Sequence, residues 1–72
     1  MKLHYYPETD SLYIELSSGT AADSREVASG VVLDFGADGR LVGIDVDHAS
    51  DKVDLSRLEG EGIPLPTAPS RR

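Results

Sequence analysis

The chain has 72 residues, with thirteen acidic and seven basic side chains, a net charge of −6 and no cysteine. This length predicts one domain with a thin core, and the lack of cysteine excludes disulfides and thiolate metal sites. All thirteen acids but only five of the bases precede residue 63. A body of that charge repels phosphate backbones, so direct binding of nucleic acid is not expected, whereas a basic protein would be attracted.

The length and hydropathy of the chain predict its cellular location and the kinds of partner it can have. No apolar run follows Lys2 and no stretch is long enough to span a membrane, so we expect neither a signal peptide nor a membrane partner. The prediction is a cytoplasmic protein. A domain this small often gains stability by pairing with a copy of itself or with another chain, so self-association or a protein partner is expected.

The first part of the chain alternates between apolar and polar side chains. Lys2–Tyr6 shows this period of two, and residues 12–16 show it again. The segment 7–10 between them, Pro-Glu-Thr-Asp, consists of turn residues. The pattern predicts a β-hairpin, followed by a polar loop and a short edge strand at about 24–28.

A second hairpin is predicted in the middle of the chain. Two runs of branched apolar residues, Val31–Phe35 and Leu41–Val46, flank a connector that contains Asp38-Gly39. These two residues tolerate the positive φ angles that a tight hairpin requires. Gly43, in the middle of the second run, leaves a gap where a side chain or backbone can approach closely.

Beyond the second hairpin the period changes to one that favours a short helix, capped by Ser50 or Asp54 and stopped by Gly60. Three apolar residues would lie towards one side of it: Val53, Leu55 and Leu58. The predicted fold class is therefore mainly β (α+β), a small antiparallel sheet of two hairpins with a short C-terminal helix. A single domain of residues 1–60 is followed by a flexible, disordered, proline-rich tail over 61–72.

Two blocks of the sequence resemble a known family. The first reads Lys-Leu-His-Tyr-Tyr-Pro-Glu-Thr-Asp-Ser-Leu-Tyr-Ile-Glu-Leu from Lys2. The second joins Val-Val-Leu-Asp-Phe, from Val31, to Asp-Gly-Arg-Leu-Val-Gly-Ile-Asp-Val, from Asp38. In this order they resemble, over about residues 1–55, a bacterial family of short proteins called domain of unknown function 2283. His48 departs from the pattern, because an apolar residue is expected there.

That family has no established activity, so the resemblance implies a fold and a setting rather than a mechanism. Its members often occur next to small, toxin-like partners. The resemblance therefore implies an antitoxin-like role, by association with the family and not from residues of this chain.

A calcium loop is one candidate metal site. Asp34, Asp38 and Asp45 fall on positions of such a loop. Gly36, however, stands at a position that must supply a ligand, and the strand pattern continues through the rest of the loop. A hairpin turn explains the Asp-Gly pair without a metal.

A second candidate combines Asp45, Asp47 and His48 with His4, which could bind a divalent ion. His48 and Asp47 with Ser50 also supply the residue types of a hydrolytic triad. The histidines lack a fixed helical spacing and the serine lacks a strained turn, so solvent-facing strand charges are the simpler explanation. We predict no catalytic, metal or cofactor-binding residue, and we do not expect an enzyme.

The polar side of the sheet is the predicted binding surface. Tyrosine is enriched at interface hot spots, and carboxylates steer a basic partner. The predicted partner-binding residues are Tyr6, Tyr13, Glu15, Asp45, Asp47 and His48. They favour a protein–protein interaction module with an acidic surface, antitoxin-like in that it would neutralise a small basic partner. The alternative is a small-ligand or metal-linked function assembled across a homodimer interface, which ligand-dependent stabilisation would reveal.

Overall fold

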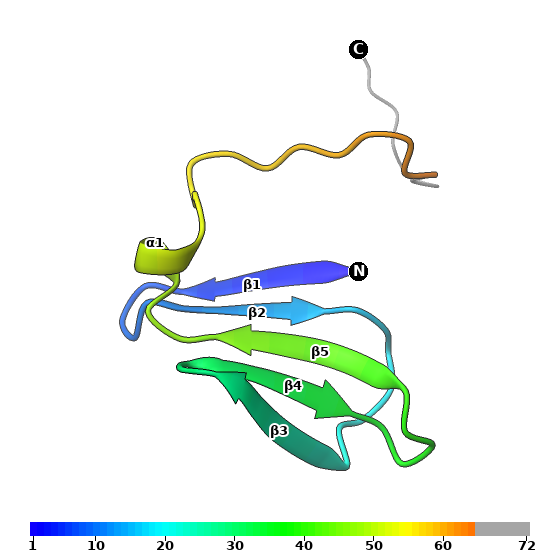
Figure 1. Cartoon of the computed structure of the whole chain (residues 1–72). Helices are drawn as coiled ribbons and strands as arrows, with labels where there is room; N and C mark the ends of the chain where they lie inside the picture. Colours follow the sequence, from blue (N-terminus) through cyan, green and yellow to red (C-terminus); the bar gives the residue numbers. More distant parts are fainter. Residues whose placement is uncertain (65–72) are drawn as a thin grey trace.

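The structure, a computed structural model, describes residues 1–64, and within them the chain forms one antiparallel sheet of five strands and a single helical turn (Figure 1). The elements are β1 (Lys2–Tyr6), β2 (Ser11–Glu15), β3 (Asp23–Ala28), β4 (Val31–Phe35), β5 (Leu41–Val46) and α1 (Ala49–Lys52). Their order across the sheet is β1-β2-β5-β4-β3, so β5 is the central strand. The predicted fold class, mainly β with a short C-terminal helix, is confirmed.

Both predicted hairpins are present, and β2 joins them by pairing with β5. Ile14 of β2 lies opposite Leu3 on one side and Ile44 on the other, and Ile44 in turn lies opposite Leu33. The β2–β3 connection then passes around the end of β5 and β4 to reach the far edge (Figure 1). This places the predicted edge strand, β3, beside β4, where Ala22 N donates to Phe35 O at 2.8 Å.

The register sorts the strand side chains onto two faces, because directly paired residues point to the same side of a sheet. One of them, called here the apolar face, carries most of the large apolar side chains: Leu3, Tyr5, Leu12, Ile14, Val31, Leu33, Phe35, Ile44 and Val46, together with Val42, two residues before Ile44 on β5. Val42 and Val46 are only 5% and 6% exposed, whereas the others are half-buried or exposed. The core thus consists of the two ends of the central strand and of Ala49 in α1, which is fully buried.

The helix is shorter than the sequence pattern allowed. It ends at Lys52, and Val53 is already extended, with φ −133° and ψ 158°. The Asp54 carboxylate accepts hydrogen bonds from both the backbone N and the hydroxyl of Ser56, at 3.0 and 2.5 Å. Such a local side-chain bond competes with helix formation, so Leu58 is left 80% exposed instead of packing on one side of a second turn.

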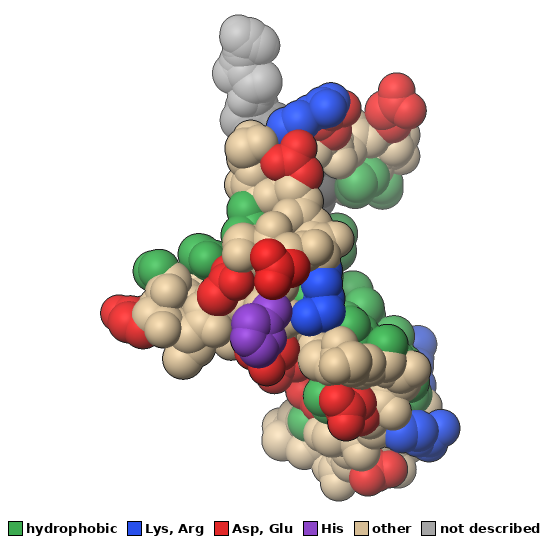
Figure 2. All heavy atoms as spheres, turned by 60° about the vertical axis from the view of Figure 1, so that its left-hand side comes forward, with side chains coloured by type: hydrophobic (Ala, Val, Ile, Leu, Met, Phe, Trp, Pro, Cys, Tyr) green, Lys and Arg blue, Asp and Glu red, His purple; other side chains and the backbone are tan. Residues whose placement is uncertain are grey.

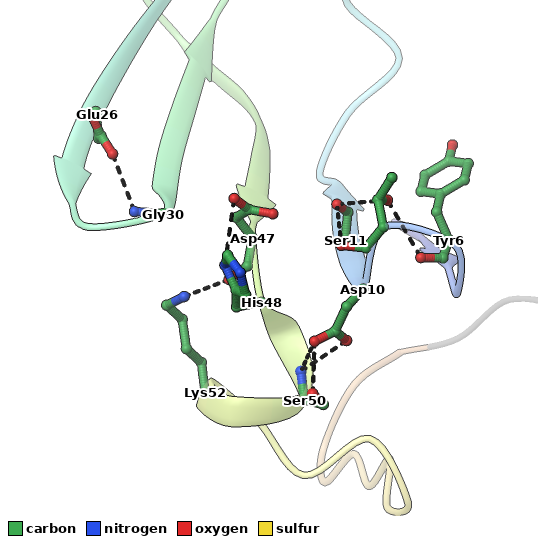
Figure 3. A network of polar contacts seen from close by, with 10 residues as sticks. Tyr6, Asp10, Ser11, Glu26, Gly30, Asp47, His48, Ser50 and Lys52 are labelled. Carbon is green, nitrogen blue, oxygen red and sulfur yellow. Dashed lines mark hydrogen bonds and ion pairs between the residues drawn. The ribbon is translucent and has the colours of Figure 1, made fainter.

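Asp10 ties α1 to the β1–β2 turn, across 40 residues of chain (Figure 3). Its carbonyl accepts from Ala49 N at 2.8 Å, and its carboxylate accepts from Ser50 N at 3.1 Å and from Ser50 Oγ at 2.6 Å. The Tyr5 hydroxyl donates to the same carboxylate at 2.8 Å. Asp10 and His48 both adopt positive φ, 54° and 52°, which brings the turn and the start of the helix together. We call this arrangement the Asp10 junction.

Beyond α1 the chain leaves the sheet and runs without helix or strand to residue 64 (Figure 1). Most of the predicted tail, residues 65–72, lies outside the described residues. Within the described part of the chain, no helix is long and apolar enough to cross a membrane.

Candidate functional site: an acidic face of the sheet

The centre of the face opposite the apolar face is built around a close approach of Tyr13 to Gly43. Gly43 of β5 pairs with Glu15 of β2 and with Asp34 of β4. The Tyr13 side chain lies directly over Gly43. A Cβ atom on Gly43 would be only 2.0 Å from the Tyr13 hydroxyl oxygen, so no larger residue fits there without a shift of Tyr13. That hydroxyl donates to Asp34 Oδ2 at 3.0 Å. Burial, and then the bond to Asp34, raise the pKa of Tyr13.

Carboxylates from three strands surround this tyrosine: Glu15, Asp34 and Asp45. With Glu26 of β3 and the adjoining Asp47 they form what we call the acidic face. Asp45 lies opposite Tyr13 on one side and Val32 on the other, and Val32 lies opposite Glu26. Burial, and then the charges of Asp34 and Asp47, raise the pKa of Asp45 above its ordinary value. Asp34 and Asp47 therefore act on Asp45 as like charges, which disfavour its ionised form.

Two of these carboxylates have neighbours that moderate their charge. Glu15 Oε1 lies 3.2 Å from His4 Nε2, an ion pair when the histidine is protonated. Asp34 also accepts a hydrogen bond from the Ser24 hydroxyl at 2.7 Å. Among residues 1–64, neither Asp34 nor Asp45 forms an ion pair with a lysine or arginine.

An open pocket of about 330 Å³ lies at one side of the acidic face. Its lining consists of Ser11, Glu26, Gly30, Val32, Asp45 and Asp47, so three carboxylates border it. Glu26 accepts from Gly30 N at 3.1 Å, and Lys52 Nζ donates to the Asp47 carbonyl (Figure 3). Lys52 thus lies beside the pocket without forming an ion pair to any of the three carboxylates.

Figure 2 shows the molecule from the side of α1, where acidic side chains gather around a histidine and hydrophobic side chains are visible on both sides of this cluster. Along the strands, the period of two sends most carboxylates to one face and most valines, leucines and isoleucines to the other, with Asp23 and Val32 as exceptions.

The structure brings some of the predicted partner-binding residues together and separates others. Tyr13, Glu15 and Asp45 share the centre of the acidic face, and Asp47 borders the pocket. Tyr6 lies on the same side at the edge strand, where it is 51% exposed. His48 is set apart at the end of the sheet. Its Nδ1 lies 3.6 Å from the Asp47 carboxylate and its side chain is 71% exposed.

Sequence reasoning did not place Asp34 and Glu26 on the binding surface. Asp34 alternates with the apolar residues of β4, so its period already assigns it to the polar side. Its meeting with Tyr13 depends on the β2–β5 pairing, which no local pattern specifies. Glu26 belongs to an edge strand whose six residues are all exposed, and such a strand carries almost no hydrophobic signal.

The candidate catalytic and metal arrangements are not assembled. Ser50 Oγ donates to Asp10, not to His48, so the histidine has no serine to activate. Asp34 and Asp45 belong to adjacent strands and not to one calcium loop. Over residues 1–64, no group of three or more His, Cys, Asp or Glu side chains is arranged to hold a metal ion.

A second open pocket, of about 720 Å³, lies at the opposite end of the sheet, between the loop after β2 and the β4–β5 turn. Its lining is mostly small and hydroxyl residues, and only Asp38 and Arg40 bring charge to it. Asp38 accepts from the backbone N of Arg40 at 3.1 Å, as a turn aspartate does. Within the described part of the chain, no hydroxyl group of this lining donates a hydrogen bond to Asp38, so no nucleophile is paired with a base there.

These features define a small antiparallel-sheet protein with one apolar and one acidic face. The family model for Protein of unknown function (DUF2283) matches residues 2–50, and the chain belongs to that family, as its two sequence blocks indicated. No curated protein and no solved structure shows significant similarity to it.

Proposed function

We propose that the chain is a protein-interaction module that binds a basic protein on its acidic face. The observation that carries the proposal is the pocket beside Asp45, which Glu26 and Asp47 also border. Three carboxylates around one opening attract a lysine or arginine side chain, and a charged face steers a basic partner towards it.

The electrostatics of Asp45 support a cationic occupant. Its pKa is raised by burial and by the nearby charges of Asp34 and Asp47, so its ionised form is disfavoured in the free protein. A lysine or arginine side chain in the pocket would reverse that effect, because an opposite charge within about 4–6 Å favours the ionised carboxylate. Binding a cation would therefore relieve a repulsion already present in the fold.

The partner that fits this chemistry is a small basic protein, and the role would be antitoxin-like if neutralising that protein is its biological purpose. The acid excess and the family resemblance support this role. A bacterial, cytoplasmic setting belongs to the same proposal. The other candidate function, a ligand or metal bound across a homodimer, has only the open pockets in its favour.

The test uses a lysine-rich peptide as the basic probe and two double variants of equal charge. Asp45→Lys with Asp47→Lys reverses two carboxylates at the pocket, whereas Glu8→Lys with Glu61→Lys reverses two exposed carboxylates elsewhere. We expect the first pair to weaken binding at least about tenfold at low salt and the second to have a much smaller effect. Titration by NMR would also locate the shifts of backbone amides.

Equal weakening by both pairs would show that only net charge matters, which would contradict a docking face. Shifts confined to the pocket and to β2, β4 and β5 in the wild-type protein would support it. Stabilisation by a metal ion, with no response to the peptide, would favour the alternative function.

A further inference from the structure

The apolar face of the sheet is left without a second layer. A sheet ordinarily buries its hydrophobic face against a helix or another sheet. Over residues 1–64, no such element lies across it, because extensive contacts are made only between neighbouring strands, and α1 is a single turn at one end. Leu3 and Tyr5 are 44% and 42% exposed, and even Ile44, on the central strand, is only half-buried.

The charge on this face differs from that of the chain as a whole. The protein carries −6, but the only charged strand residues on the apolar side are Asp23 and Arg25, which pair with Phe35 and Leu33. Both belong to the edge strand β3, and the Arg25 guanidinium lies 5.1 Å from the centre of the Phe35 ring. The centre of the face is therefore neutral, and the charges at its rim are those of Asp23, Arg25 and, at the end near Tyr5, Asp10. Two identical copies can meet there without burying like charges at the centre.

The area of the face suits a modest interface. Five strands about 4.8 Å apart, each presenting about five residues at 3.3 Å, give roughly 24 by 17 Å, or ~400 Å² before side-chain relief is counted. Two such faces bury on the order of 1,000 Å², which is the lower end of specific protein–protein interfaces. An interface of this size, composed of aliphatic and aromatic side chains, is expected to give a dimer with micromolar affinity.

We propose that two copies of the chain pair through their apolar faces, forming a two-sheet sandwich with both acidic faces outward. A twofold arrangement uses the same neutral patch on each copy, and two sheets pack naturally at about 10 Å with their strands rotated by about 30°. The inference goes beyond the proposed function, because it concerns the opposite face. The dimer would present two acidic faces on opposite sides.

The test compares two lysine substitutions on the same strand. Leu3→Lys and Tyr6→Lys each add one positive charge to β1, at positions 44% and 51% exposed, but on opposite faces of the sheet. Sedimentation equilibrium over low micromolar to submillimolar concentrations would measure dimerisation of the wild type and both variants. Circular dichroism melts would confirm that each variant is folded. We expect Leu3→Lys to raise the dimer Kd at least about tenfold, and Tyr6→Lys to change it little.

A second measurement does not depend on any substitution. In a mixture of differently isotope-labelled wild-type chains, intermolecular NOEs are expected between methyl groups of Ile14, Leu33 and Ile44. A wild type that stays monomeric throughout the concentration range would overturn the proposal. So would equal weakening by both variants, which would indicate edge-to-edge pairing through β1, or NOEs confined to the acidic face.

Discussion

Asp10, in the β1–β2 turn, and Asp45, in β5, are two carboxylates of the same domain whose surroundings shift their pKa in opposite directions. Asp10 receives hydrogen bonds from Ser50 and Tyr5, and these, the Ser50 hydroxyl first, hold its pKa below the ordinary value. Asp45 is exposed but lies close to Asp34 and Asp47, and slight burial together with these charges raises its pKa. One carboxylate is stabilised in its ionised form by the fold, and the other is destabilised.

The difference separates an acid that stabilises the fold from one that destabilises it. The Asp10 junction fixes α1 to the β1–β2 turn, so its carboxylate contributes to folding. The ionised form of Asp45 opposes folding, yet the register of four strands places it on one face with Glu15, Glu26 and Asp34. A destabilised carboxylate among other carboxylates is typical of binding sites, where a partner later compensates the charge. The three predictions below test this contrast, from the largest expected effect to the smallest.

Removing the Asp10 carboxylate should produce the largest loss. Asp10→Ala deletes the acceptor for Ser50 and Tyr5, and it also places alanine at φ 54°, where a side chain other than Asp or Asn is strained. We expect the melting temperature to fall by about 10 °C at pH 7. Asp10→Gly, which tolerates this φ, should lose less. An unchanged melting temperature in both variants would mean that the junction is not formed in solution.

Substituting Gly43 should disturb the acidic face directly. In Gly43→Ala the new methyl group would overlap the Tyr13 hydroxyl and ring, so Tyr13 must turn away and its bond to Asp34 is lost. We expect the melting temperature to fall by about 5 °C. Tyr13→Phe, which removes only the hydrogen bond, should lose less, and Gly43→Ala should cost little when made in a Tyr13→Ala background. Additive losses in that double variant would contradict the close approach.

The sequence predicted most local elements of this fold because β1, β2, β4 and β5 each have a clear period of two and each predicted hairpin has its own turn residues. The Asp-Gly pair at 38–39 specified the β4–β5 turn, and Gly39 does adopt a positive φ of 84°. Gly43 was correctly interpreted as a place of close approach. The pairing of β2 with β5 was not predictable in this way, since it joins two hairpins through residues far apart in sequence.

The acidic face was predictable only in part for the same reason. Tyr13, Glu15 and Asp45 could be assigned to the polar side from alternation alone. Their grouping with Asp34 and Glu26 required the order β2-β5-β4-β3. The helix was predicted too long, because the bond from Ser56 to Asp54 is a competing local interaction that hydrophobic spacing does not reveal.

The smallest expected effect is on the melting temperatures of Asp45→Asn and Asp10→Asn. The pH dependence of these temperatures is the most direct test of the contrast. The folded-state pKa of Asp45 is raised, so the ionised carboxylate lowers the stability of the fold. This loss of stability is complete above the folded-state pKa and disappears as the pH falls below the unfolded value of about 3.8. Asp45→Asn should therefore raise the melting temperature by about 2 °C at pH 7, and this gain should vanish in acid.

The Asp10 carboxylate changes the stability of the fold in the opposite direction. Its folded-state pKa is lowered, so its stabilisation is complete above the unfolded value of about 3.8 and is lost as the pH falls through the folded pKa. Asp10→Asn keeps a residue that tolerates positive φ, and it should lower the melting temperature at pH 7 but not in strong acid. Melts of both variants and the wild type from pH 7 to pH 2 would show two differences of opposite sign that converge. If Asp45→Asn destabilised the protein at pH 7, the fold would stabilise the Asp45 carboxylate, and the electrostatic support for a cation-binding acidic face would be lost.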